Sequence, residues 1–285
     1  MTIAQTSLSA ALLMLAAAPP AEPKDGEGAK SQAAWSALFD RTAKTYEIYL
    51  DAEHTRPLLL RAEPVYKWTA ASAGSDTHGA VYVWTYRGCP ETVACFWRLG
   101  HSLAQEAHVL SPTVLDPVRA GHRPWTPAAG LTRRVLAAAP APAEKPAARL
   151  AQMRRLGSAF SGHAAGDDGQ RRELRLLNTP LFRYESSDPE IIDGALFGFV
   201  CTVGTDPEAF LLLEARRTGE NVQWQYALAR FSHLNLSIDY DGKQVWESLR
   251  GAGDNADQTY YLVFKEPLET PKLGDVEDGA EKAGD

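Results

Sequence analysis

Residues 193–216 read DGALFGFVCTVGTDPEAFLLLEAR, two apolar runs separated by a short break that contains Asp206, Pro207 and Glu208. Runs of aliphatic and aromatic residues bounded by Gly, Pro and Asp are typical of β-strands. An Asp side chain accepts backbone N–H bonds at the first position of a turn, and Pro fits the second position. We therefore expect a hairpin turn here, in which Asp206 and Pro207 are structural residues and not members of a catalytic carboxylate pair.

The same order of features occurs earlier, in HGAVYVWTYRGCPE at residues 78–91. Gly79 precedes the first apolar run as Gly194 does, and Pro90 follows it as Pro207 follows the later one. The order and spacing of such matches persist over roughly 90 residues, which predicts two copies of one unit. We expect Gly79 and Gly194 to be structural residues that allow a tight entry into each central strand.

Two further segments have apolar residues at the three- and four-residue spacing of a helix face. Their members are Trp35, Leu38, Phe39, Thr42 and Tyr46 in the first segment and Leu150, Met153, Leu156 and Phe160 in the second. Each helix precedes one set of strands. The expected fold class is therefore α+β, with two tandem pseudo-symmetric repeats, each a helix packed on an antiparallel β-meander. One continuous sheet and two separate small domains both fit this pattern.

The predicted organisation of the chain has six parts. They are a signal peptide at 1–18, a linker at 19–30, a first α+β repeat at 31–125, a Pro/Ala-rich linker at 126–145, a second α+β repeat at 146–265 and an acidic disordered tail at 266–285. The apolar stretch from Leu8 to Ala18 is too short to span a bilayer and has the length of a secretory signal, although a disordered Ala/Pro leader is the alternative. We expect an exported protein, periplasmic or secreted, with no integral membrane segment after processing.

Charge and cysteine content indicate which partners to expect. The 285-residue chain has a net charge of −7, and because acidic residues concentrate in the tail, the body is nearly neutral. Nucleic-acid binding depends on a basic face, so no nucleic-acid partner is expected. Cys89, Cys95 and Cys201 lack the spacing of metal ligands, and no cofactor-binding motif is present. The sequence therefore predicts no cofactor and no metal.

Residues 100–110 hold the candidates for chemistry. Ser102 lies in GHSLA, which looks like the nucleophile elbow of hydrolases, but that elbow belongs to a parallel sheet and this chain alternates strand with strand. Glu106 and His108 are two residues apart, so on a strand both side chains face one way and could form an acid/base pair or half of a metal site. Neither motif is complete.

Charged side chains in the second half are expected to have structural roles. Arg183, Arg216 and Arg230 are candidates for pairing with Glu185 and Glu214, and such pairs are usually structural. The most consistent hypothesis for function is a non-enzymatic exported protein that binds a partner protein or a small ligand between its two repeats. The alternative is a hydrolase, esterase-like or metal-assisted, that uses the Ser102 or Glu106/His108 candidates.

The segments LRLLNTPLFRY (174–184), DGALFGFVCTVGTDPEAFLLLEAR and WQYALARF (224–231), preceded by HGAVYVWTYRGCPE, resemble a family of exported bacterial proteins of the planctomycete type whose activity is uncharacterised. The resemblance covers about residues 31–248, and the second-half segments are its most specific part. It implies export and an intact unit over this range. It implies no activity and no catalytic residues.

Overall fold

The structure, a computed structural model, describes residues 25–70, 77–128, 130–137, 139–166, 169–202, 204–249 and 259–266. The predicted signal peptide, half of the first linker (residues 19–24) and nearly all of the acidic tail lie outside the described residues. In the described part there are two helices, α1 at Asp25–Lys44 and α2 at Pro146–Gly157. Neither is long and apolar enough to span a membrane.

Six strands from both ends of the chain form one antiparallel sheet. Its order is β17-β6-β5-β4-β2, and β3 also pairs with β4. The strands are β2 at Leu59–Leu60, β3 at Tyr66–Thr69, β4 at His78–Tyr86, β5 at Cys89–Leu99, β6 at Ser102–Val109 and β17 at Tyr260–Glu266. Beside it, β1 at Tyr46–Tyr49 and β7 at Asp116–Arg119 form a two-stranded sheet.

A nine-stranded antiparallel sheet contains the opening stretch of sequence. Its order is β16-β15-β9-β10-β12-β13-β14-β8, with β11 also paired to β12. The strands are β8 at Arg134–Val135, β9 at Phe160–Ala165, β10 at Arg171–Leu176, β11 at Phe182–Tyr184, β12 at Ile191–Cys201, β13 at Pro207–Thr218, β14 at Asn221–Arg230, β15 at Asn235–Tyr240 and β16 at Lys243–Ser248.

The expected fold class, two α+β repeats that each place a helix on a meander, is wrong. In the part of the chain that it describes, the structure is mostly β, with 51% strand and 13% helix, and its strands form sheets and a half-barrel. β17 follows the second half of the chain but joins β6 of the first, and β8 pairs with β14 from within the expected linker. The prediction failed because the central strands are buried on both faces, and one helix can cover only one face. Nearly every residue of β4 and β12 is buried, and a strand that is apolar on both faces needs a layer on each side.

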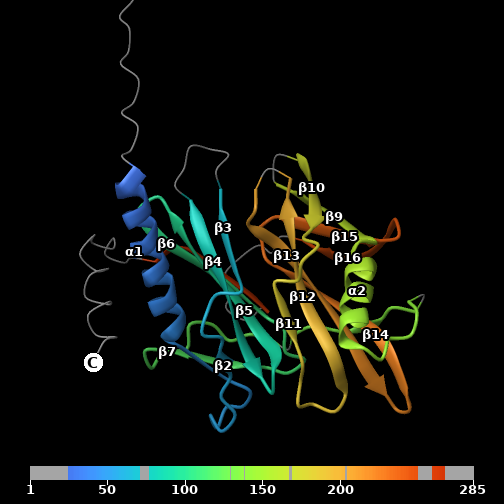
Figure 1. Cartoon of the computed structure of the whole chain (residues 1–285). Coiled ribbons are helices and arrows are strands. Elements are labelled where there is room, and N and C mark those ends of the chain that lie inside the picture. The colour runs from blue at the N-terminus through green and yellow to red at the C-terminus, as the bar shows by residue number, and fades with distance from the viewer. Residues whose placement is uncertain are drawn as a thin grey trace, which may run out of the picture.

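Figure 1 shows α1 at the left beside the six-stranded sheet, and α2 at the right against the nine-stranded sheet, whose strand β14 extends past the helix. Alternate residues of each central strand face opposite layers, which gives one core between the two sheets and one core under each helix. The core between the sheets includes Val81, Cys95, Leu196 and Leu212. The core under α1 includes Trp35, Phe39, Tyr82 and Phe96, and the core under α2 includes Met153, Phe197 and Leu211.

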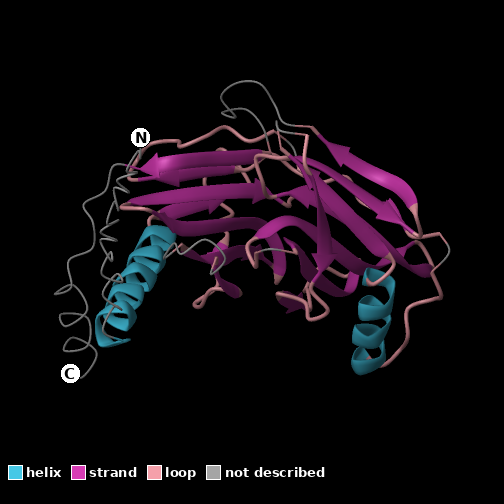
Figure 2. Cartoon of the chain, turned by 90° about the horizontal axis from the view of Figure 1, so that it is seen from above, coloured by secondary structure: helices cyan, strands magenta, loops and turns pink. Residues whose placement is uncertain are grey.

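The nine-stranded sheet curves strongly, as the view from above shows in Figure 2. Its two ends lie close together. The Arg134 side chain on β8 donates through Nη1 to the carbonyl of Val245 on β16 over 2.6 Å. Near the end of β14, Arg230 Nη1 donates to the carbonyl of Leu249 over 2.8 Å. We call the junction of β8 and β14 with β16 the seam. Arginine side chains bridge it where a closed barrel would have a backbone ladder.

The expected turn residues lie at the hairpins as follows. β12 ends at Cys201, Asp206 is the last residue of the connection, and Pro207 is already the first residue of β13. In the earlier hairpin, positive φ angles of 51° at Arg87 and 88° at Gly88 mark the turn. Pro90 is therefore not part of that turn but the second residue of β5.

Candidate functional site

The sequence candidates for catalysis lie on β6 but do not form one site. Ser102 is the first residue of this strand, and His108 lies six residues further along it. At about 3.3 Å per residue, the two residues are about 20 Å apart. A hydrolytic Ser requires a base within hydrogen-bond reach, so His108 cannot serve Ser102 in this fold.

Glu106 and His108 are close on β6, yet each has its own partner. Tyr260 Oη donates to Glu106 Oε2 over 2.7 Å, while His108 Nδ1 lies 2.7 Å from the carbonyl oxygen of Val109. Burial raises the pKa of Glu106 well above its usual range and lowers the pKa of His108 to about 4. His108 is therefore uncharged at pH 7 and does not titrate near pH 7 as an efficient general base does.

The part of the chain that the structure describes contains neither a metal site nor a reactive cysteine site. No group of three or more His, Cys, Asp and Glu side chains there could hold a metal ion. Cys89, Cys95 and Cys201 are buried free thiols. Burial raises the pKa of Cys89 to about 11 and the pKa of Cys95 well above its usual value. Because the thiolate is the reactive form, Cys89 and Cys95 are expected to be inert.

A pocket of about 380 Å³ lies at the seam, and we call it the seam pocket. Its size is within the range of small-ligand sites, roughly 300–1,000 Å³. Both sheets contribute to its walls. They include Tyr226 and Leu228 of β14, Arg134 of β8, Trp246 of β16, and His108 and Tyr260 from the six-stranded sheet. Residues 250–258, which connect Leu249 to Thr259, lie outside the described residues.

Arg230 lines the seam pocket and is 8% exposed. Besides the bond to Leu249, its Nη2 donates to the carbonyls of Leu234 and Ser248. Its guanidinium lies 5.6 Å from the centre of the Tyr260 ring, and burial lowers the pKa of Arg230. Among the described residues it pairs with carbonyl oxygens and no carboxylate. Buried charges in proteins are normally paired with an opposite charge, so this one lacks its usual partner.

Arg134 supplies a second positive charge at the same pocket. Its side chain is exposed, and within the described chain only Nη1 of its guanidinium has a hydrogen-bond partner, the carbonyl of Val245. Nε and Nη2 remain available as donors. No Asp or Glu is among the described residues that line the pocket. The seam pocket of this acidic protein is therefore locally positive, and it favours an anion.

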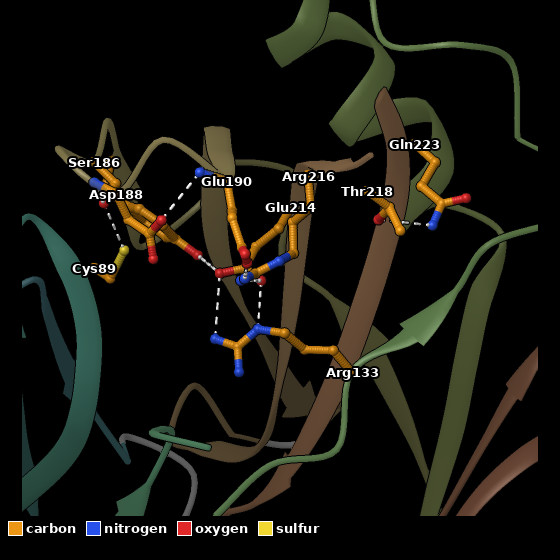
Figure 3. Close-up of polar contacts among 10 residues, drawn as sticks. Cys89, Arg133, Ser186, Asp188, Glu190, Glu214, Arg216, Thr218 and Gln223 are labelled. Atoms are coloured by element: carbon orange, nitrogen blue, oxygen red, sulfur yellow. Dashed lines mark hydrogen bonds and ion pairs between the residues drawn. The ribbon is translucent and has the colours of Figure 1, made fainter. Parts of the chain in front are cut away.

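Another polar cluster, around Glu214 of β13, lies between the two sheets (Figure 3). Glu214 is 1% exposed and accepts bonds from Arg133 Nε at 2.5 Å, Arg216 Nη1 at 3.1 Å and Tyr184 Oη at 2.7 Å. Burial acts to raise the pKa of Glu214, but Arg133, Tyr184 and Arg216 together hold it below the usual value. Since its oxygens are used within the protein, we interpret this cluster as a clamp that fixes the Arg133 segment and β11 to the sheet.

The expected pairing of the second-half arginines is confirmed for one residue. Arg216 pairs with Glu214. Arg183 instead binds Asp193, and Arg230 donates to carbonyl groups. No sequence motif indicated Arg134, since the pair Arg133 and Arg134 in a Pro/Ala-rich segment matches no diagnostic pattern. The seam depends on the curvature of the whole sheet, which no local pattern encodes.

The structural candidates Gly79 and Gly194 both lie beneath aromatic rings. A Cβ at Gly79 would lie 2.7 Å from the Trp68 indole, and one at Gly194 would overlap the Tyr184 ring. Trp68 pairs with Gly79 across β3 and β4, as Tyr184 pairs with Gly194 across β11 and β12. Asp206 is partly buried, and burial raises its pKa.

Comparison with models of protein families, with curated proteins and with solved structures gives no match.

Proposed function

We propose that this chain is a non-enzymatic, exported binding protein, and that the seam pocket holds a ligand with at least one negatively charged group. The observation that carries the proposal is the buried charge of Arg230, which has no carboxylate partner among the described residues. Export is supported by the signal-like apolar stretch at the N-terminus. The resemblance to exported planctomycete-type proteins points to the same compartment.

The shape and chemistry of the pocket fit this role. Two donor nitrogens of Arg134, Nε and Nη2, have no partner among the described residues and can bind a carboxylate or phosphate oxygen. Charge-assisted bonds of this kind are the strong ones. Tyr226, Trp246 and Tyr260 supply apolar surface for the rest of the ligand. The hydrolase alternative has no comparable support, because Ser102 lies about 20 Å from His108 along β6.

Calorimetric titration of the full chain tests the proposal with three probes: glutarate, citrate and the acidic pentapeptide acetyl-Val-Glu-Val-Glu-Val-amide. We expect at least one probe to bind, and Arg134→Gln to weaken its binding at least about tenfold, the effect of losing one charge-assisted bond. The matched control is Arg217→Gln, because Arg217 is an exposed arginine on β13 outside the pocket lining. Binding of none of the probes, or equal affinities of the wild type and Arg134→Gln, would contradict the proposal.

A further inference from the structure

The geometry of the seam points to the class of ligand: we infer that the pocket takes an extended acidic peptide segment, which adds as a strand to the free edge of β14. This inference rests on the proposed function and deepens it. Three features carry it: an unpaired stretch of strand edge, a second edge that no backbone ladder closes, and the positive charge between them.

The first feature is the outer edge of β14. β8 pairs with β14 at Gln225 and Tyr226, and the Leu136 N–H just after β8 donates to the carbonyl of Trp224. The bond from Phe231 N–H to the carbonyl of Glu208 shows that odd-numbered residues of β14 direct their backbone groups to β13. Backbone direction alternates along an antiparallel strand, so Leu228 directs its N–H and C=O outward. Among the described residues these groups have no backbone partner, and Leu228 lines the seam pocket.

The second feature is the opposite side of the seam. Here β16 is the last strand of the sheet, and it pairs only with β15. Arg134 and Arg230 cover its carbonyls at Val245 and Ser248, and the next carbonyl at Leu249, with side-chain donors. A segment that adds to β14 at the seam therefore replaces side-chain contacts and breaks no strand pairing. Exposed edges of this kind are the sites at which extended peptides add to sheets.

The third feature is chemical complementarity. The pocket has two arginines and no acidic residue among its described lining, so it favours acidic side chains. Successive side chains of an added strand point to opposite sides. The side chains on one side of the added strand would reach the Arg134 guanidinium, and those on the other side would contact Trp246 and Tyr226. An extended peptide with alternating acidic and apolar residues matches both surfaces.

A scan of backbone N-methylation tests strand addition directly. Each amide nitrogen of acetyl-Val-Glu-Val-Glu-Val-amide is methylated in turn, which removes one N–H and leaves every side chain and charge unchanged. We expect methylation to weaken binding at least tenfold at alternate residues and less than twofold at the residues between them, because only every second N–H of a strand faces its neighbour. A peptide with Gln in place of both Glu residues should also bind more weakly.

The outcomes separate this inference from the proposed function. If glutarate or citrate binds in an Arg134-dependent manner but the pentapeptide does not, the proposed function stands and the peptide inference is overturned. Peptide binding with equal sensitivity at all methylated positions also overturns strand addition. If no probe binds at all, both fail. An alternating pattern in the wild type, with binding weakened by Arg134→Gln and unchanged by Arg217→Gln, supports both.

Discussion

Tyr184 and Gly194 show how single residues decide the packing of the central strands. The Tyr184 ring covers Gly194, and its hydroxyl is fixed by the 2.7 Å bond to Glu214. Glu214 is held in turn by Arg133. The ring therefore cannot move aside to make room for a Cβ. The sequence predicted a structural role for Gly194 but not the packing that requires a glycine there. The Tyr184 ring, the Glu214 carboxylate and the Arg133 guanidinium come from three separate segments.

Gly194→Ala should lower the free energy of unfolding by about 1–3 kcal/mol, the usual effect of overpacking a tight site. The matched control is Gly198→Ala on the same strand. There, a Cβ would lie 3.1 Å from Cδ1 of Leu181, the end of a flexible side chain, so we expect a clearly smaller effect. Urea unfolding of both variants measures the difference. Equal destabilisation would show that the Tyr184 ring is not the obstacle.

Strands and helices agree with the sequence prediction where the pattern of apolar residues within one segment determines them. The apolar runs at 78–84 and 194–200 are central strands, as their composition predicts. Both helix predictions extended too far, because Tyr46 belongs to β1 and Phe160 to β9. Each of these aromatic residues faces the same core as the helix before it, so the apolar spacing runs on after the helix has ended. The spacing of apolar residues therefore indicates which residues face a core, but not whether a residue lies in the helix or in the strand that follows it.

One buried ion pair attaches α2 to the nine-stranded sheet. Asp193 on β12 is fully buried and accepts from Arg149 Nε at 2.8 Å and Arg183 Nη2 at 2.7 Å. Arg149 also binds the carbonyls of Ala143 and Glu144, which fixes the start of the helix. Removal of one partner from such a group leaves buried charge uncompensated.

Asp193→Asn should therefore lower the free energy of unfolding by about 3–5 kcal/mol. Asp206→Asn provides the comparison. Burial raises the pKa of Asp206, and an amide keeps the acceptor oxygen of the turn, so we expect a loss of about 0.5 kcal/mol or less. Chemical unfolding at pH 7 measures both. If Asp206→Asn is the more damaging, Asp206 acts through its charge, and its interpretation as a turn residue is wrong.

At the scale of the whole molecule, two sheets enclose several carboxyl groups, and this arrangement makes stability depend on pH. Burial raises the pKa of Glu91 on β5 and of Glu208 on β13 to about 7. The sequence indicated apolar strands but not that Glu91 and Glu208 would lie between two sheets. That position follows from face-to-face packing of sheets whose strands are distant in the chain.

The free energy of unfolding should decrease as the pH rises from about 4.5 to about 7.5. In this window the folded state binds protons at Glu91 and Glu208 that the unfolded state has released, so raising the pH favours unfolding by about 3 kcal/mol for each group. Glu91→Gln, which cannot ionise, should reduce the slope. Below about pH 4 the sign reverses, because Glu214 has a lowered pKa and loses its ion pairs when protonated. Urea midpoints measured from pH 4 to 8 would contradict this interpretation if they rise steadily with pH.

The whole-molecule feature on which function depends is the seam, and amide hydrogen exchange at β14 tests its role most directly. The full chain is measured with and without saturating acetyl-Val-Glu-Val-Glu-Val-amide. We expect the Leu228 amide to exchange at least tenfold more slowly with the peptide, because its outward N–H gains a strand partner. Ala227 and Ala229 serve as internal controls, since they pair with Leu212 and Phe210 on β13 in both states. Unchanged exchange at Leu228 with the peptide bound would contradict strand addition at the seam.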